Sequence, residues 1–481
     1  MPSYSAPIED IKFVLQNVVE IHDSQIPGYS ELDNEYLNAI LEEASKISNE
    51  VLAPLNSIGD EHGCTFENGI VYTPPGFKEA FNQLKDGGWT GIDCDVKFGG
   101  QGLPYLVSIA VGEMFASANM ALGMYHGLTH GAYSAIYSHG SDEQKKKYLP
   151  NLVNCKWTGT MNLTEPHCGT DLGLMRTKAI RRSDGTFQIS GQKIFISAGD
   201  HDLAENIIHL VLAKIPNGPD GVKGISLFIV PKFLVNDDGS LGARNQVSVG
   251  KIEKKMGIHG NATCVMNYDG ATGYLVGEEH KGMRAMFTMM NNARLGVAVQ
   301  GLSQSELATQ KAIEFAKTRH QGRNMNNFDE ISTPIINHAD VRRNLLIMKS
   351  LTYISRALCF ETALTIDLSK NKNDPFLKRK ASFLTPIAKS FCTEIGGKVA
   401  DLAIQIHGGM GYIEETGISQ VYRDVRITSI YEGTNGIQAM DFVGRKLGSN
   451  GDIAYSILDE IKNNFNIPVT TDIHLPEHAN A

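Results

Sequence analysis

The chain has 481 residues and a formal net charge of −9, and 42% of its residues are hydrophobic while 20% are charged. This length allows about three domains with a sizeable core, and the composition is ordinary for a globular protein. The negative charge argues against a nucleic-acid-binding surface, which needs clustered lysine and arginine side chains.

The first part of the chain has helical spacing. Residues 1–35 are predicted to be a short N-terminal extension, and residues 36–157 a helical domain. Apolar residues at helical spacing begin at Leu37 and continue until Pro54 ends the helix. Small and apolar residues return at 107–137 and predict a buried pair of helices.

The pattern changes to strands after Trp157. Alternating segments at 186–190 and 193–197 flank Gly191 and predict a hairpin. Residues 158–279 are therefore predicted to form a small antiparallel β-domain. Further β-branched runs, bounded by Gly, Asp and Pro, lie at residues 206–215, 224–230, 247–252 and 264–268.

Helical spacing then resumes. A helix is predicted from Arg294 to about His320, and another at 384–406, where apolar residues recur at steps of three and four. Long helices with short connections predict a bundle over residues 280–447. Residues 448–481 are predicted to be a helix followed by a disordered tail rich in Pro, Asp and His.

The cysteines and the apolar stretches indicate in which cellular compartment the protein is expected. There are seven cysteines, and no two are spaced Cys-x-x-Cys, which argues against a disulfide framework and a structural zinc site. The apolar stretches near 106–115 and 207–215 are too short to span a membrane, and residues 1–4 do not resemble a signal or transit peptide. We therefore expect a cytoplasmic protein that is not inserted in a membrane.

Residues 430–436 read Ile-Tyr-Glu-Gly-Thr-Asn-Gly and form the most informative stretch of the chain. Glu432 lies between an apolar pair and a turn whose Gly433 and Gly436 allow a ligand to approach the backbone closely. Apolar surroundings raise the pKa of a carboxyl group and make it a usable base near neutral pH. Taken by itself, the pattern also fits a surface turn with a solvated glutamate.

A series of motifs resembles those of the acyl-CoA dehydrogenase family over nearly the whole chain. The resemblance implies a mainly α-helical protein with an N-terminal α-domain, a middle antiparallel β-domain and a C-terminal four-helix bundle. The motifs, in chain order, are a Thr-Glu-Pro signature at 161–171, a flavin strand at 192–197, arginine motifs at 293–296 and 319–323, a glycine loop at 405–411, and the glutamate turn.

The finer resemblance is to the subgroup that oxidises 3-methylmercaptopropionyl-CoA in dimethylsulfoniopropionate breakdown. Residues 4–7 and 254–260 carry this likeness. Three alternatives stay open. They are a short- or medium-chain fatty acyl-CoA dehydrogenase, an acyl-CoA oxidase that passes electrons to O₂, and an inactive flavin- or CoA-binding scaffold.

The implied reaction is FAD-dependent α,β-dehydrogenation of an acyl-CoA thioester. By resemblance, Glu432 removes a proton from Cα while a hydride passes from Cβ to flavin N5. The backbone N–H of Glu432 and a ribityl hydroxyl group of FAD polarise the thioester carbonyl. The resemblance also implies an electron-transfer flavoprotein or similar acceptor, and a homodimer or tetramer.

The resemblance also assigns residues to FAD. Arg319, accompanied by Gln321, would reach the pyrophosphate of a neighbouring subunit's FAD; its position also fits a role at the negative end of a helix dipole. Phe195 would pack on the flavin ring or in a hairpin core, and Glu165 is expected to be structural. The assigned residues are Met161, Leu163, Thr164, Ser197, Arg319, Gln321, Gln405, Gly408, Gly409 and Thr434.

The substrate assignments follow in the same way. Arg294 would help to hold the CoA end of the substrate, or it could form an exposed salt bridge on a helix. Asn291 replaces an aspartate that is common in the family. The full set is Thr170, Asn291, Arg294 and Gly433. No metal site is expected, because three histidines considered as ligands lack a ligand spacing; they are His126, His130 and His407.

Overall fold

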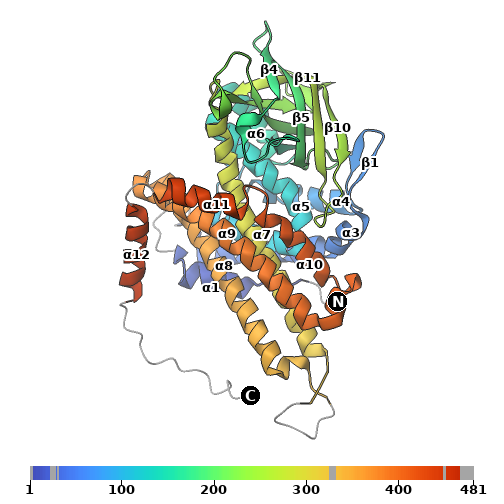
Figure 1. The fold of residues 1–481 in the computed structure, drawn as a ribbon, viewed down its shortest axis with the longest axis vertical. Helices are drawn as coiled ribbons and strands as arrows, with labels where there is room; N and C mark the ends of the chain where they lie inside the picture. The colour runs from blue at the N-terminus through green and yellow to red at the C-terminus, as the bar shows by residue number, and fades with distance from the viewer. Residues whose placement is uncertain (1–3, 22–28, 30–31, 324–331, 448–450, 466–481) are drawn as a thin grey trace.

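A computed structural model describes residues 4–21, 29, 32–323, 332–447 and 451–465. The elements run in the predicted order, from helices through a sheet to a long helical bundle, so the predicted fold class is confirmed (Figure 1). The tail that we expected to be disordered lies outside the described residues.

The long helix α5 organises the N-terminal region. It runs over Tyr105–His139 with a kink at Asn119, whose backbone angles are non-helical, so two buried helical segments follow one another, as predicted. By length and composition α5 could cross a membrane, but 78% of its apolar window is buried inside the protein, as in a core helix. The other helices are α1 (Ile8–Asn17), α2 (Asn34–Lys46), α3 (Pro54–His62), α4 (Phe77–Asp86) and α6 (Asp142–Val153).

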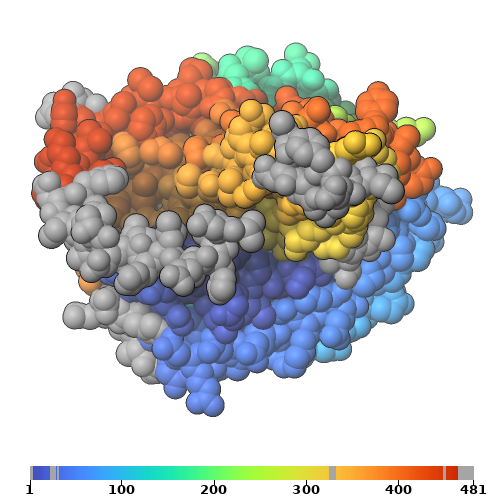
Figure 2. All heavy atoms as spheres, turned by 90° about the horizontal axis from the view of Figure 1, so that it is seen from below, coloured from blue at the N-terminus to red at the C-terminus, as the bar shows by residue number. Residues whose placement is uncertain are grey.

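The stretch expected to be an N-terminal extension contains α1. Its Ile11 and Leu15 are fully buried in the main hydrophobic core. Asp10 accepts a hydrogen bond of 2.6 Å from Lys349 of α8 (Ala339–Asn371) and another from Tyr353. Helix α1 thus packs against α8, and in the view from below the N-terminal residues (blue) lie beside those of the bundle (yellow to orange) (Figure 2).

The middle of the chain forms a seven-stranded sheet. Most neighbouring strands are antiparallel, as predicted, but β3 pairs with β6 in parallel, and β4 also makes a parallel contact with β6. The expectation of a purely antiparallel sheet is therefore wrong for these pairs. The strands are β3 (Trp157–Asn162), β4 (Lys178–Arg181), β5 (Phe187–Ser197), β6 (Asn206–Lys214), β7 (Ile225–Pro231), β10 (Val247–Ile252) and β11 (Thr263–Val276). Smaller two-stranded sheets join β1 (Thr65–Glu67) to β2 (Ile70–Tyr72) and β8 (Phe233–Val235) to β9 (Leu241–Arg244).

The predicted hairpin at Gly191 is wrong. Strand β5 continues through this residue and pairs with β11 on both sides of it. A Cβ atom at Gly191 would lie 2.4 Å from Oγ1 of Thr177, and φ is +153°. The glycine therefore serves a close approach within the sheet and not a turn.

Three long helices build the C-terminal bundle: α7 (Gly282–Thr318), α8 and α9 (Pro375–His407). The helices predicted at 294–320 and 384–406 are confirmed, although both begin earlier than expected. Helices α7 and α9 approach closely, since a Cβ atom at Gly301 would lie 2.4 Å from the carbonyl oxygen of Cys392. Shorter helices follow at α10 (Ile418–Val425), α11 (Asn435–Asp441) and α12 (Asp452–Phe465).

A buried ion cluster joins α5, α7 and α8. Arg356 of α8 is fully buried, and its Nε donates to Glu113 of α5 at 2.9 Å. Its Nη2 donates to Glu113 at 2.6 Å and to Glu306 of α7 at 2.7 Å. Each carboxylate is at most 2% exposed, so one guanidinium group compensates two buried negative charges.

Candidate active site

Two cavities meet at Glu432. The large cavity, of about 930 Å³, lies between the sheet, α7 and the segment that precedes α11. The small cavity, of about 190 Å³, lies between α5 and α7. Glu432, Tyr431 and Ser197 line both cavities, so the two form one site with the carboxylate at the junction.

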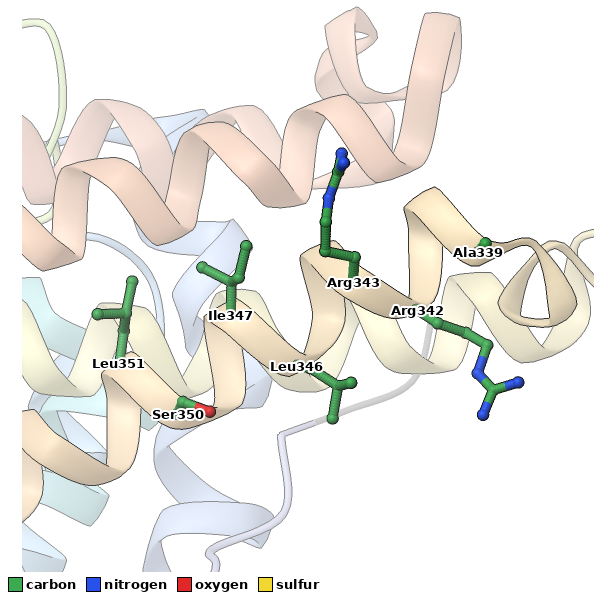
Figure 3. Close-up of a pocket in the computed structure, with 7 residues that line it drawn as sticks. All are labelled: Ala339, Arg342, Arg343, Leu346, Ile347, Ser350 and Leu351. Carbon is green, nitrogen blue, oxygen red and sulfur yellow. The ribbon is translucent and has the colours of Figure 1, made fainter. Parts of the chain in front are cut away.

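A third hollow, of about 560 Å³, lies along the surface of α8 (Figure 3). Arg342 and Arg343 are its only ionisable lining residues among those described, and they point in different directions. Its described lining contains no carboxylate or histidine, so the hydroxyl group of Ser350 has no base beside it there. The chemistry therefore belongs to the site at Glu432.

The backbone at Glu432 has an unusual conformation. Glu432 has a φ of +56° and Gly433 has a φ of +86°, so two consecutive residues are left-handed. Such a conformation in a non-glycine residue persists only where neighbouring groups hold it. Nε2 of Gln438 donates to the carbonyl oxygen of Glu432 at 3.0 Å, and Nζ of Lys389 donates to that of Gly433 at 2.8 Å.

The surroundings of Glu432 suit a base. Burial raises its pKa to about 7, and the positive charges of Arg294 and Lys389 oppose this rise. The carboxyl group therefore loses its proton near neutral pH, and its proton affinity there is well above that of a solvated glutamate. A position at the junction of two cavities does not fit the alternative of a solvated surface turn.

Arg294 is buried, with 4% of its surface exposed, and Nη1 donates to Asp441 at 3.2 Å. The alternative of an exposed salt bridge is therefore wrong. Arg445 also donates to Asp441, at 2.5 Å. Nε of Arg294 is buried and has no hydrogen-bond partner among the described residues, and the residue lines the large cavity.

Most of the predicted ligand-binding residues come together at the large cavity. Thr434 also caps α11, because its hydroxyl oxygen accepts from the N–H of Ile437. Asn291 is exposed and is not among the described residues that line either cavity. The predicted residues that line the large cavity are Met161, Leu163, Thr164, Thr170, Ser197, Arg294, Glu432, Gly433 and Thr434.

Phe195 lies on the wall of the large cavity. It has a φ of +58°, and 61% of its surface is exposed, which excludes the alternative of a hairpin core residue. The ring can pack on a planar ligand. Cationic side chains also line this cavity and would attract phosphate groups; they are Lys254, Lys255, Arg423, Arg426 and Arg445. Together with the hydroxyl groups of Thr164 and Ser197, these features fit FAD.

Five predicted FAD-binding residues lie elsewhere. They are exposed at the adjacent ends of α7 and α9, which the stacked rings of Phe315 and His407 join at a centroid distance of 4.3 Å. They are not among the described residues that line the cavities. The structure therefore does not bring them to Glu432 within one chain. These residues are Arg319, Gln321, Gln405, Gly408 and Gly409.

Glu165 has the structural role that we expected. Its carboxylate accepts hydrogen bonds from the N–H groups of Arg176 and Thr177 at 2.7 and 3.0 Å. Nζ of Lys193 donates to Glu165 at 2.9 Å and to the carbonyl oxygen of Leu163 at 2.9 Å. The ion pair of Glu165 and Lys193 fixes the segment just after β3, and this segment borders the large cavity.

Among the described residues, two groups could hold a metal ion by distance. One contains Glu165, whose oxygens already accept the hydrogen bonds described above. In the other, Asp93 accepts a 2.9 Å hydrogen bond from Nε2 of His130 beside Cys94. Since protein groups already bind the carboxylates, we assign no metal to either group.

Two residues near Glu432 escaped the sequence analysis. Lys389 occupies a fully buried position on α9 between Ala388 and Cys392, and a lysine at such a position could have been noticed. No sequence pattern indicated that Asp441 belongs to the site, because its partner Arg294 is distant along the chain.

Comparison with known proteins gives a consistent result. Models of the acyl-CoA dehydrogenase N-terminal, middle and C-terminal domains match residues 34–156, 160–271 and 280–447. The chain is 46% identical to 3-methylmercaptopropionyl-CoA dehydrogenase from Ruegeria pomeroyi over 453 residues, which are 93% of this chain and 77% of the relative.

Solved structures agree. The butyryl-CoA dehydrogenase structure from Megasphaera elsdenii is 30% identical, has a TM-score of 0.71, and covers 85% of this chain and 98% of its own. A chain from the structure of the electron transferring flavoprotein of Acidaminococcus fermentans is 26% identical, has a TM-score of 0.72, and covers 86% of this chain and 98% of its own.

Proposed function

This chain belongs to the acyl-CoA dehydrogenase family of FAD-dependent oxidoreductases, and on this premise we propose that Glu432 is the base that removes the α-proton of an acyl-CoA thioester. The observation that carries the proposal is the carboxylate at the junction of the two cavities, with a pKa of about 7. The acyl chain occupies the small cavity, and the large cavity holds the cofactor and the thioester end.

In the proposed reaction, the Glu432 carboxylate takes the proton from Cα. Bound FAD would supply the acceptor for the hydride that leaves Cβ, so the substrate would lose one proton to Glu432 and one hydride, with its two electrons, to the cofactor. The backbone N–H of Glu432 donates a hydrogen bond to the thioester carbonyl, where negative charge develops. The Phe195 ring and the Thr164 and Ser197 hydroxyl groups orient the cofactor in the large cavity.

We propose a short acyl chain with a thioether, as in 3-methylmercaptopropionyl-CoA. The relative at 46% identity supports this substrate. The small cavity, at about 190 Å³, has about a fifth of the volume of the large cavity, at about 930 Å³, which favours a short acyl chain. Its wall carries aromatic rings and thioethers, with which sulfur makes favourable contacts; they are Trp89, Phe115, Met120 and Met124. A four-carbon acyl chain, as in the butyryl-CoA dehydrogenase of similar structure, is the second candidate.

A panel of acyl-CoA thioesters, mixed anaerobically with the yellow protein, tests the substrate. We expect 3-methylmercaptopropionyl-CoA to bleach the flavin faster than pentanoyl-CoA, its matched control with CH₂ in place of sulfur, and faster than butyryl-CoA. A twelve-carbon acyl chain should react slowest, because it is the bulkiest of these chains for the small cavity. Faster bleaching by the twelve-carbon substrate would assign the protein to general fatty-acid oxidation.

We propose an electron-transfer flavoprotein as the acceptor, supported by the similarity to the chain from Acidaminococcus fermentans. In the same experiment, air is admitted after the flavin has been bleached. Slow return of the yellow colour in air, and fast return with an electron-transfer flavoprotein, fits a dehydrogenase. Fast return in air with release of hydrogen peroxide would indicate an oxidase.

We also propose that the exposed residues at the ends of α7 and α9 bind the FAD pyrophosphate of a neighbouring subunit. Arg319→Ala should weaken FAD binding by tenfold or more, since a hydrogen bond to a charged group contributes about 1.5–3 kcal/mol. The measurement is the FAD-to-protein ratio after dialysis. The matched control is Lys317→Ala, which removes an exposed charge from the last turn of α7 and should leave FAD binding unchanged.

The same samples report the assembly by light scattering. We expect a dimer or a tetramer. A monomer that retains one FAD per chain would contradict the proposal, because its FAD could not contact Arg319 of another subunit. Equal FAD retention in the Lys317 and Arg319 variants would instead favour the helix-dipole role, which involves no contact with FAD.

A further inference from the structure

We infer that Lys389 is a positioning residue for proton abstraction: it fixes the turn that carries Glu432 and keeps a positive charge beside the carboxylate. The inference rests on the proposed role of Glu432 as the base. It concerns a residue outside the cavity walls that acts on the substrate only through Glu432.

Lys389 of α9 holds the turn through hydrogen bonds. Its side chain is fully buried, and Nζ donates to the carbonyl oxygen of Gly433 at 2.8 Å and to Oδ1 of Asn435 at 2.9 Å. Asn435 in turn lies 3.1 Å from Oγ1 of Thr393, one helical turn after Lys389. Helix α9 therefore holds the turn on both sides of Thr434.

The turn needs such support because its backbone is strained. Glu432 has left-handed backbone angles, which non-glycine residues rarely adopt because the β-carbon then crowds the backbone. The hydrogen bond from Lys389 fixes the peptide that follows Gly433, and Gln438 fixes the carbonyl group of Glu432. Relaxation of the turn would break these bonds and move the carboxylate away from its position between the cavities.

The charge of Lys389 has a second effect. Arg294 from α7 and Lys389 from α9 are the cationic groups that act on Glu432, and Tyr431 precedes it in the chain. Arg294 is paired with Asp441 and lies near Arg445, whereas Lys389 donates to neutral oxygen atoms. Burial lowers the pKa of Lys389 to about 8; the negative charges of Glu432 and Glu394 favour its protonated form, and the positive charge of Arg294 opposes it. A lysine that stays charged in this place favours the ionised base.

Lys389→Met tests both effects, because methionine is unbranched and fills the space without the charge. We expect FAD content to be retained and flavin reduction to slow by about 10- to 100-fold. The pH at which reduction is half-maximal should rise by about one unit, since loss of a nearby positive charge raises the pKa of a carboxyl group. The matched control is Lys398→Met, at an exposed position of α9, which should match the wild type.

Two further variants separate position from charge. Asn435→Ala loosens the turn but keeps the lysine, so the rate should fall while the pH midpoint stays. Lys389→Arg keeps the charge in an altered geometry, so the midpoint should return toward the wild-type value although the rate does not fully recover. These two variants carry the test if Lys389→Met does not fold.

The inference is overturned if Lys389→Met has the wild-type rate and midpoint, or if its slower rate comes with lost FAD and an unchanged midpoint, as a packing role predicts. It also fails if Lys389→Arg and Asn435→Ala both match the wild type. Glu432→Gln, measured in parallel, tells the two proposals apart. Normal flavin reduction by Glu432→Gln would refute the role of Glu432 as the base. If Glu432→Gln is inactive but Lys389→Met has the wild-type pH midpoint, only the inference about Lys389 is refuted.

Discussion

Replacing Glu432 with glutamine should slow flavin reduction by an acyl-CoA substrate by about 10²–10⁴-fold, the effect of losing a general base. Glutamine has nearly the same shape and cannot accept the α-proton. Folding, FAD binding and acyl-CoA binding should survive. Stopped-flow absorbance of the flavin, under anaerobic conditions and at saturating substrate, measures the rate.

Glu415→Gln is the matched control. Glu415 is exposed and lies outside the lining of both cavities among the described residues, so its variant should reduce the flavin at the wild-type rate. Glu165 follows Thr164, which lines the large cavity, but hydrogen bonds and Lys193 bind its carboxylate. A Glu432→Gln variant with the normal rate would show that another group removes the proton.

Replacing Arg356 with methionine should lower the free energy of unfolding by about 3–5 kcal/mol. The change leaves Glu113 and Glu306 buried between α5, α7 and α8 without their cation. A buried carboxylate without a partner is costly, so each must take up a proton or draw water into the core. Urea unfolding followed by circular dichroism measures the loss, at a protein concentration held constant because assembly affects stability.

Arg379→Met is the control for this experiment. Arg379 is exposed, and its nitrogen lies 3.8 Å from an exposed Asp452 carboxylate; such surface pairs contribute about 0–1 kcal/mol. Adding Glu113→Gln and Glu306→Gln to the Arg356 variant should restore part of the lost stability, because the uncompensated charges disappear. A stability loss as small as that of the control would mean that the cluster is solvated and contributes little.

Local patterns in the sequence were enough for the helices and for the chemistry of single motifs. The apolar positions at 384–406 identified α9, since a helical period depends only on neighbours three and four residues apart. The glutamate turn was identified from adjacent residues, and the likeness to the acyl-CoA dehydrogenase family joined it to the flavin motifs. The structure brings Thr164, Ser197 and Thr434 to one cavity with Glu432.

Pairing between distant segments depended on the tertiary structure. Alternation around Gly191 has the appearance of two strands and a turn, and only the contact with Thr177 explains the glycine. In the same way, the sequences of β3 and β6 do not indicate that these strands pair with each other in parallel.

The electrostatics of the site also came from the fold. Sequence analysis identified Glu432 as a candidate base, but Lys389 and Asp441 join the site from segments whose own patterns show no link to it. Whether Arg294 forms an exposed or a buried ion pair depended on the fold, which places Asp441 of α11 beside it. Side-chain periodicity reports which face of an element is apolar, whereas the charge and burial at one atom depend on every segment that packs around it.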